Sequence, residues 1–296
     1  MRGIRYVGRD TGNLTDEELL YIHKEIIGAA WPALRAREIF EIEPVSSVGY
    51  RSIRKYTETD MGEALISLEG ESINLDRTQL EAGTDVHLPV IHKEFTINWR
   101  DLEANRPFAE SLDLREARNA ARQVAEVENR LCFSGESTLW RVWGILGLML
   151  AVPATQDNAG GAWPANAIAN INVAIGELES SGFNPPYVLL APVAQIRKLH
   201  VQLGAGGAGM TYYKFLLENN ILQGIIADDS VIATDDGVDS AIVCAPGKDN
   251  FSLMVARDVT VHTAPLPNMN LFGRVYEVAV PLIKRPYALA EINTIT

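Results

Sequence analysis

The chain has 296 residues, of which 47% are hydrophobic, and its formal net charge at pH 7 is −12. This length allows one large domain or two of ordinary size, with enough apolar side chains for a substantial core. The negative charge argues against tight sequence-specific DNA binding, which requires a basic face, although many soluble enzymes are equally acidic.

The two cysteines and the longest apolar run narrow the class of protein. Cys132 and Cys244 are far apart and form no C-x-x-C pair, so we expect neither a disulfide framework nor a cysteine-rich zinc site. We expect Cys132 to be a small buried thiol. The run Val142–Ala154 contains Pro153 and is well short of the ~20 residues that span a bilayer. With a polar N-terminus that lacks a signal core, the sequence predicts a cytosolic protein without membrane contact.

The first helix is predicted after an extended arm, Met1–Leu14. Thr15 and Glu18 form a capping box at its start. Trp31-Pro32 should bend or end it. Its apolar positions, spaced by three and four residues, are Leu19, Ile22 and Ile26.

A long hairpin with modest burial is predicted over Glu43–Val90. Strand-like pieces, SVGYRSIRKYT and EALISLEG, are separated there by glycine and acidic residues. A two-stranded hairpin is too thin for independent stability, and its charges suit a polar interface, although a solvated hairpin would look the same. Our candidate interface residues on it are Tyr50, Arg51, Arg54, Lys55, Asp60 and Glu63.

The next segment joins a strand to a long amphipathic helix. Phe95, Ile97 and Trp99 alternate with polar residues, which predicts a half-buried strand that would cover Val86–Trp99 if Pro89 did not interrupt it. Asp113 and Glu116 then form a D-x-x-E start for a helix over Leu114–Phe133. The predicted buried face consists of Leu114, Ala117, Ala121, Val124 and Leu131, and the outer face carries Arg122, Glu126 and Arg130.

The second half predicts a compact α+β lobe. After the break ATQDNAGGAWP, one helix is predicted to end at Gly182, and Pro192 starts another. Between them YVLL is a short buried strand, and the strands IIA, SAIVCAP, FSLMVA and VTVHTAP follow. The first helix has one apolar face, made of Ile168, Ile171, Ile175 and Leu178.

The glycine-rich stretch GAGGAG is open to two interpretations. Gly204, Gly206 and Gly209 satisfy G-x-G-x-x-G, and acidic residues follow about 20 positions later, as in dinucleotide-binding folds. The glycines follow the helical stretch PVAQIRKLH, however, and a nucleotide-binding enzyme would require a buried strand that ends at Leu203. We therefore favour a surface loop and keep the enzyme as the alternative.

Two clusters resemble metal sites but lack the required spacing. His87, His92 and Glu94 could share an ion only if a bulge at Pro89 brought positions of opposite parity to one face. A second cluster lacks the D-x-D-x-D-G spacing of a calcium loop and consists of Asp228, Asp229, Asp235, Asp236 and Asp239. We predict no metal, no cofactor and no catalytic residue.

Three stretches, FTINWRDLEANRPF, AARQVAEVENRLCFSGE and GILGL, resemble in this order the encapsulins and the tailed-virus major capsid proteins that share the Hong Kong 97 (HK97) fold. Weaker resemblance extends from NLTDEELLYIHKEI to VYEVAVPLIKRPYALAEI. It implies an α+β, HK97-like capsid fold with a long spine helix, a β-hairpin extended loop over a neighbouring subunit, a peripheral domain and an axial domain. The expected divisions are 1–44 for the arm and first helix, 45–100 for the extended loop, 101–153 for the spine-helix region, 154–265 for the axial domain and 266–296 for a strand that returns to the peripheral domain. In this resemblance the loop with Gly204, Gly206, Gly207 and Gly209 lies at a symmetry axis.

The function that this resemblance implies is a structural subunit, not an enzyme, which assembles with many copies of itself into an icosahedral shell. Encapsulins carry a Gly-Pro-Gly-Trp type element where this chain reads EIEPVSSVGYRS. That departure and the longer arm favour a tailed-virus major capsid protein, located in the virion and enclosing double-stranded DNA without sequence-specific contacts. The alternative is an encapsulin, a cytoplasmic nanocompartment that encloses cargo proteins.

Overall fold

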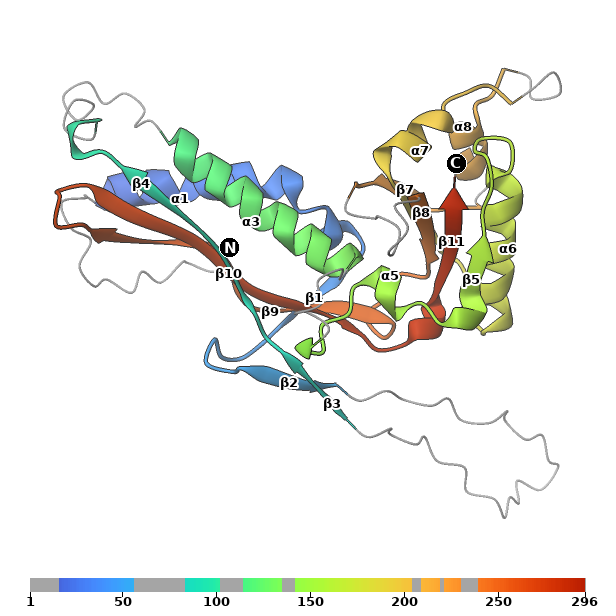
Figure 1. Ribbon diagram of the computed structural model, residues 1–296, viewed down its shortest axis with the longest axis horizontal. Coiled ribbons are helices and arrows are strands. Elements are labelled where there is room, and N and C mark those ends of the chain that lie inside the picture. The colour runs from blue at the N-terminus through green and yellow to red at the C-terminus, as the bar shows by residue number, and fades with distance from the viewer. Residues whose placement is uncertain are drawn as a thin grey trace, which may run out of the picture.

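The computed structural model describes residues 16–55, 83–101, 114–134, 142–203, 209–218, 221–229 and 239–295. Figure 1 shows two lobes: in one, two long helices lie along a sheet of long strands, and in the other, shorter elements surround a second sheet. We call them the four-stranded lobe and the five-stranded lobe. A separate two-stranded hairpin lies below them in this view.

The four-stranded lobe is built on a long antiparallel pair, β9 and β10. Its strand order is β1-β9-β10-β4, so that β1 and β4 are the edges. Both α1 and α3 pack on one face of this sheet (Figure 1). The elements are α1 (Asp16–Ala30), η1 (Trp31–Ala33), η2 (Arg35–Glu38), β1 (Glu41–Pro44), β4 (Val90–Ile97), α3 (Arg115–Phe133), β9 (Phe251–Pro265) and β10 (Leu271–Ile283).

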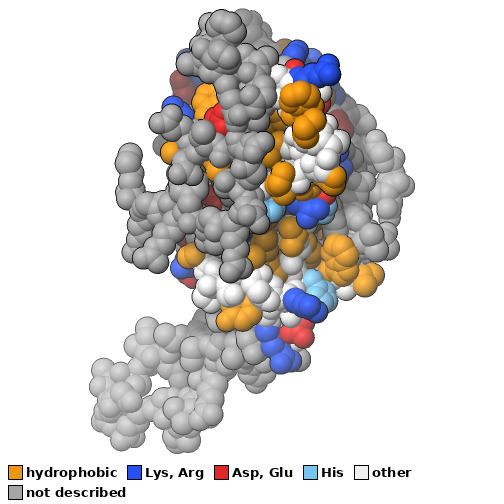
Figure 2. All heavy atoms as spheres, turned by 90° about the vertical axis from the view of Figure 1, so that its left-hand side faces the viewer, with side chains coloured by type: hydrophobic (Ala, Val, Ile, Leu, Met, Phe, Trp, Pro, Cys, Tyr) orange, Lys and Arg blue, Asp and Glu red, His pale blue; other side chains and the backbone are white. Residues whose placement is uncertain are grey.

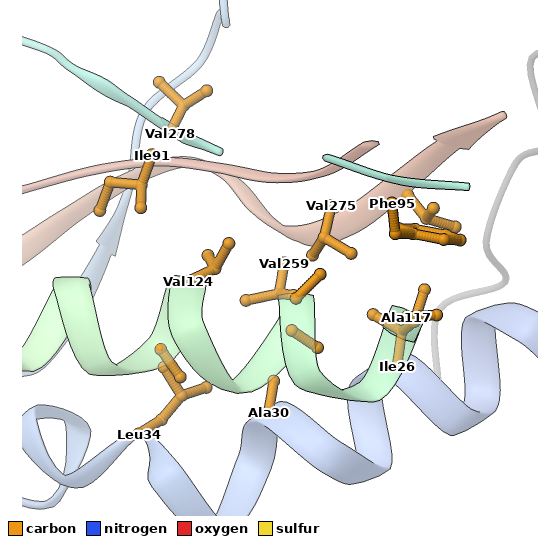
Figure 3. Close-up of a cluster of buried hydrophobic side chains, with 14 of the residues drawn as sticks. Ile26, Ala30, Leu34, Ile91, Phe95, Ala117, Val124, Val259, Val275 and Val278 are labelled. Carbon is orange, nitrogen blue, oxygen red and sulfur yellow. The ribbon is translucent and has the colours of Figure 1, made fainter. Parts of the chain in front are cut away.

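The two helices bury the apolar faces that the sequence predicted. In α1 these are Leu19, Ile22 and Ile26, and the helix ends where Trp31 begins η1. In α3 all five predicted positions are buried, from Leu114 to Leu131. Figure 3 shows the resulting core, in which side chains of both helices meet those of β4, β9 and β10. Burial of this area, at roughly 25 cal/mol per Å² of apolar surface, is the main stabilising contribution in the lobe.

The start of α3 differs from the prediction. Leu114 stands at the N-cap position and makes no side-chain capping hydrogen bond. Glu116 instead accepts a hydrogen bond from the backbone N–H of Thr96 in β4, at 3.4 Å. The acid in the first turn thus ties the helix to the sheet, while Asp113 lies outside the described residues.

The condition of one strand over Val86–Trp99 is not met, because the chain is interrupted at Pro89, the irregularity that the sequence left open. β3 (Thr84–His87) ends before Pro89, which has no backbone N–H for a ladder, and β4 begins at Val90. β4 ends at Ile97, and Trp99 already belongs to a helical turn, where its N–H donates to Asn270 Oδ1 at 3.3 Å.

The five-stranded lobe has the strand order β5-β11-β8-β6-β7. Helix α6 packs on β11 and buries Ile171 and Leu178, and the chain turns at Gly182 with a φ of 85°, as the predicted helix end requires. The predicted strand YVLL overlaps β6, which begins one residue later and is buried at all four positions. The elements are α5 (Leu148–Ala151), η4 (Ala154–Gln156), β5 (Asp157–Ala159), α6 (Ala167–Ser180), β6 (Val188–Ala191), α7 (Val193–Lys198), α8 (Tyr212–Glu218), β7 (Gly224–Ala227), β8 (Asp239–Cys244), η5 (Pro286–Ala288) and β11 (Leu289–Ile295).

The chain changes sheet at other points than the division at residue 265 implies. FSLMVA and VTVHTAP form one strand, β9, which was expected in the axial domain 154–265. In the structure β9 pairs with β10 in the four-stranded lobe. Of the segment 266–296, β10 lies in the four-stranded lobe, whereas the last strand, β11, pairs with β8 in the five-stranded lobe. Backbone pairing decides this, and both β9 and β11 are apolar enough for either sheet.

Besides the core of each lobe, a further cluster of buried apolar side chains connects the two lobes. Phe40 and Phe251 meet there edge to face, with ring centroids 5.0 Å apart. Cys132 and Cys244 are both free and fully buried in this cluster, as expected for Cys132, and burial raises the pKa of each thiol. Within the described residues, no helix combines the length and the apolar character that crossing a bilayer requires.

Candidate subunit interface

The described part of the hairpin consists of β2 (Ser52–Lys55) and the antiparallel β3. Arg54 faces Asp85 in the register, with Nε and Oδ1 3.9 Å apart, and both side chains are exposed. Such a pair contributes little to stability. Burial lowers the pKa of Lys55, while Ile53 packs on the core of the four-stranded lobe.

Backbone hydrogen bonds close the base of this hairpin and connect it to the segment 142–147. The N–H of His87 donates to the carbonyl of Trp143 at 2.9 Å, and the N–H of Leu88 donates to the carbonyl of Arg51 at 2.9 Å. Gly144 has a φ of 73°, and a Cβ there would lie 2.8 Å from the carbonyl oxygen of Asp85. The segment 142–147 can therefore approach β3 closely only with glycine at this position.

Two adjoining open hollows lie beside this base. One lies between β4 and α3, the other between β4 and the turn that precedes β2, and both are lined by Pro89, Val90 and Trp143. The apolar side chains are unusually exposed: Val90 by 56%, Tyr50 by 53% and Trp143 by 39%. A contiguous exposed apolar surface of this kind often marks a site of interaction with another molecule. We call it the Val90 groove.

Basic and imidazole side chains lie around the apolar centre of the Val90 groove. They are Arg51, His87, His92 and Lys93. Figure 2 shows exposed hydrophobic side chains interspersed with Lys, Arg and His on one face of the molecule. Among the described strands β4 is also an edge of its sheet, and edge strands are common sites of pairing with another chain. Trp143 and Val90 were not among our candidates: Val90 ends the predicted hairpin and could have been included, whereas only the tertiary structure brings Trp143 to it.

The predicted interface residues divide into described and undescribed positions. Tyr50 and Arg51 line the Val90 groove, and Arg54 and Lys55 lie on β2. Asp60 and Glu63 lie outside the described residues, as does the arm 1–14.

The flanks of the glycine loop do not have the context of a dinucleotide site. The residues before it form α7, and Gln202 makes only an isolated antiparallel bridge to Thr211. Leu203 donates its N–H to the carbonyl of Met210 at 2.8 Å, which closes the ends of the loop. Gly209 has a φ of 79°, whereas Gly204, Gly206 and Gly207 lie outside the described residues.

The candidate metal ligands are engaged or separated. His87 belongs to β3 and His92 to β4, which are in different sheets, and Glu94 pairs with Arg274. Asp229 accepts from the N–H of Val193 at 3.0 Å. Asp239 accepts from Gln195 at 2.6 Å, and no cluster of three potential ligands occurs within the described ranges. Asp235 and Asp236 lie outside them.

Comparison with known proteins identifies the family. A family model described as "Encapsulating protein for peroxidase" (Linocin_M18) matches residues 4–277. The chain belongs to this family. The match thus covers the elements from α1 to the first half of β10, and β11 of the five-stranded lobe lies beyond it.

Two curated relatives carry encapsulin names. The type 1 encapsulin shell protein EncA of Myxococcus xanthus is 25% identical over 298 residues, which cover 97% of this chain and 96% of EncA. A diheme-cytochrome-encapsulin shell fusion protein of Kuenenia stuttgartiensis is 26% identical over 69% of this chain and 53% of its own length.

Solved structures show the fold. A virus-like particle from Pyrococcus furiosus superposes with a TM-score of 0.64 at 15% identity, covering 93% of this chain and 99% of its own. The SrpI encapsulin of Synechococcus elongatus gives 0.59 at 12% identity, over 99% and 96%. The capsid protein of phage XM1 gives 0.59 at 14%, over 86% and 89%. The predicted HK97-like fold is confirmed, and the chain is a member of a family of shell-forming proteins.

Proposed function

We propose that this protein is an encapsulin: many copies form a closed shell that encloses cargo proteins, as a nanocompartment in the cytoplasm. The family match over residues 4–277 carries this proposal, and the nearly full-length similarity to EncA supports it. The family description names peroxidase, which makes a peroxidase the first candidate for the cargo.

This proposal reverses the order in which the sequence ranked the two shells. The viral head protein came first because EIEPVSSVGYRS departs from an encapsulin element. Capsids and encapsulins share one fold, so fold elements alone could not separate them. The family model and EncA favour the encapsulin, and neither supports enclosed DNA. The formal charge of −12 is also consistent with a wall that does not adhere to nucleic acid.

The experiment is purification of the full-length chain from its native host. We expect closed particles of megadalton mass by light scattering and electron microscopy, with a co-purifying protein protected from external protease. Nuclease-resistant DNA inside the particles would instead support the viral head protein. A monomer that persists across salt and protein concentration would contradict both.

We further propose that the Val90 groove receives the segment 56–82 of a neighbouring copy. Between β2 and β3 this segment contains seven acidic residues, one arginine and several apolar residues, so its composition complements an apolar groove with a basic rim. A second copy would also supply the packing that a two-stranded hairpin lacks. Shell assembly would then depend on an apolar contact that the isolated subunit leaves open.

A further inference from the structure

Two glutamates interrupt apolar rows that face each other inside the four-stranded lobe. Glu128 continues the buried face of α3 one turn after Val124, and Glu277 follows Val275 on the helix-facing side of β10. Both glutamate side chains have no solvent exposure. Buried carboxylates are costly unless they are paired or neutral.

One guanidinium joins both acids. Arg37 of η2 donates from Nε and Nη2 to the two carboxylate oxygens of Glu128 at 3.1 and 2.9 Å, and Nη2 also contacts Glu277. Its Nη1 donates to Asp258 of β9 at 2.9 Å, and the Asp258 side chain is 68% exposed. Burial alone would lower the pKa of Arg37, but Glu128, Glu277 and Asp258 outweigh it and raise that pKa. The arginine stays charged, and it neutralises only one of the two buried acids.

The strand geometry aims Glu277 at this site. Tyr276 pairs with Thr260 but Val278 pairs with Arg257, so Asp258 and Val259 together face Glu277 in a β-bulge. Bulges of this kind redirect side chains and recur at special sites. On its other side Glu277 faces the apolar Ile91 of β4. From α3 the Cys132 thiol also lies near the two glutamates, and burial together with their charges raises its pKa, so it stays neutral.

One oxygen in the cluster lacks a partner among the described residues. Glu277 Oε2 is buried and accepts no hydrogen bond. A proton on this oxygen would turn it into a donor toward the carboxylate of Glu128. Two buried acids with one proton and one arginine then form a neutral set, as paired carboxylates in other proteins do.

We propose that Glu277 carries a structural proton that it shares with Glu128, and that loss of this proton at alkaline pH loosens α3 and η2 from the β9–β10 pair. In the assembled shell, a consequence that rests on the proposed function, this loosening would open the wall.

The direction of the pH effect follows from the group itself. Burial, together with the charge of Glu128, raises the pKa of Glu277 to about 10, and Arg37 opposes this rise. The folded state therefore holds a proton that the unfolded chain releases near its ordinary pKa. Below about pH 4.5 the proton on Glu277 makes its full contribution to stability. Above that pH, its contribution to the folding equilibrium constant falls about tenfold per pH unit until about pH 10. The group makes the fold sensitive to alkali, not to acid.

The experiment compares the full-length wild type with Glu277→Gln, which keeps the shape and a donor but cannot ionise. Infrared difference spectra at neutral pH should show the C=O band of a protonated carboxylic acid in the wild type only. In urea unfolding, the ratio of wild-type to variant folding constants should fall several hundred-fold between about pH 7 and pH 10. Wild-type particles should open at a lower pH than particles of the variant.

Two further variants keep the interpretation sharp. Glu128→Gln removes the second carboxylate, so Glu277 should ionise opposite Arg37 and the infrared band should disappear at neutral pH. Glu94→Gln removes an exposed acid on β4 and should leave the band intact. A band that persists in Glu277→Gln or in Glu128→Gln would overturn the proposal. If particles form but lack the infrared band, only the proposed proton on Glu277 is contradicted. If the band is present but the protein never assembles, only the proposed shell function is contradicted.

Discussion

At the residue scale, Gly273 lets strands β10 and β4 pack closely. It faces Phe95 across the β10–β4 pair, and the phenyl ring occupies the space where a Cβ would stand. This packing covers a glycine in a strand with an aromatic ring from its neighbour, an arrangement that helps to fix register. The register of β4 in turn places Val90 at the start of the strand, beside the hairpin.

Gly273→Ala is therefore expected to destabilise the subunit by about 1–3 kcal/mol, because Phe95 must leave its position. The matched control is Gly176→Ala in α6, where a Cβ meets nothing within 4 Å and the higher helix propensity of alanine should stabilise by up to about 1 kcal/mol. Urea unfolding measures both. Equal effects of the two substitutions would show that β10 and β4 do not approach as described.

Among the elements, helix α3 has one buried and one exposed face. Its inner face contacts β4 and β10, and its outer face carries an exposed ion pair between Arg122 and Glu126 at 3.2 Å. The two faces should respond to substitution very differently.

Val124→Asp would bury an unpaired charge at a position that is 1% exposed, and we expect a loss of more than about 4 kcal/mol together with the loss of soluble assembly. Arg122→Gln, on the same helix, should cost only about 0.3–0.5 kcal/mol. Circular dichroism and particle yield measure the outcome, and wild-type yield from Val124→Asp would mean that this face is not core.

The Val90 groove is the second element-scale feature, and it separates folding from assembly. Val90→Glu places an acid in the groove opposite the acidic segment 56–82, so assembly should fall while subunit stability changes by less than about 0.5 kcal/mol. Val173→Glu, on an α6 side chain exposed by 53%, is the control and should assemble normally. Light scattering and urea unfolding report the two properties. If both variants assemble alike, the groove is not the contact.

At the scale of the whole molecule, the glycine loop is our candidate for contacts around a symmetry axis. The residues on either side of it are joined by the bridge between Gln202 and Thr211, which lies outside the named strands. Close approach of several copies favours residues without side chains.

Replacing Gly206 and Gly209 together with valine should impair closure, because valine adds bulk where we propose that several copies meet. The left-handed φ of Gly209 makes valine unfavourable there, but this strain lies outside the two sheets, so the subunit should still fold. Electron microscopy should show open sheets or aberrant particles. Saturable micromolar binding of ATP or NAD by the wild type, abolished by the same double substitution, would instead support the nucleotide-binding alternative.

The sequence alone determined the local elements. Periodic apolar residues placed α1, α3 and α6, because a helix with one apolar face must bury it, and a short continuous apolar run placed β6. The resemblance carried by FTINWRDLEANRPF and the helix after it predicted the HK97-like fold, which the comparisons confirm. Glu128 also lay in the apolar row of α3, so its burial was readable from the spacing, although we did not predict it.

Only the tertiary structure decided which segments from distant parts of the chain meet. β9 and β11 are both apolar, and backbone hydrogen bonds to β10 and β8 assign them to different sheets. The site of Arg37, Glu128 and Glu277 unites three elements more than 90 residues apart, at a bulge that no local pattern marks. Local periodicity indicates which face of an element is buried, but the residues that pack against that face depend on long-range packing. Those neighbouring residues decide whether a buried acid is neutralised by a positive charge or keeps its proton.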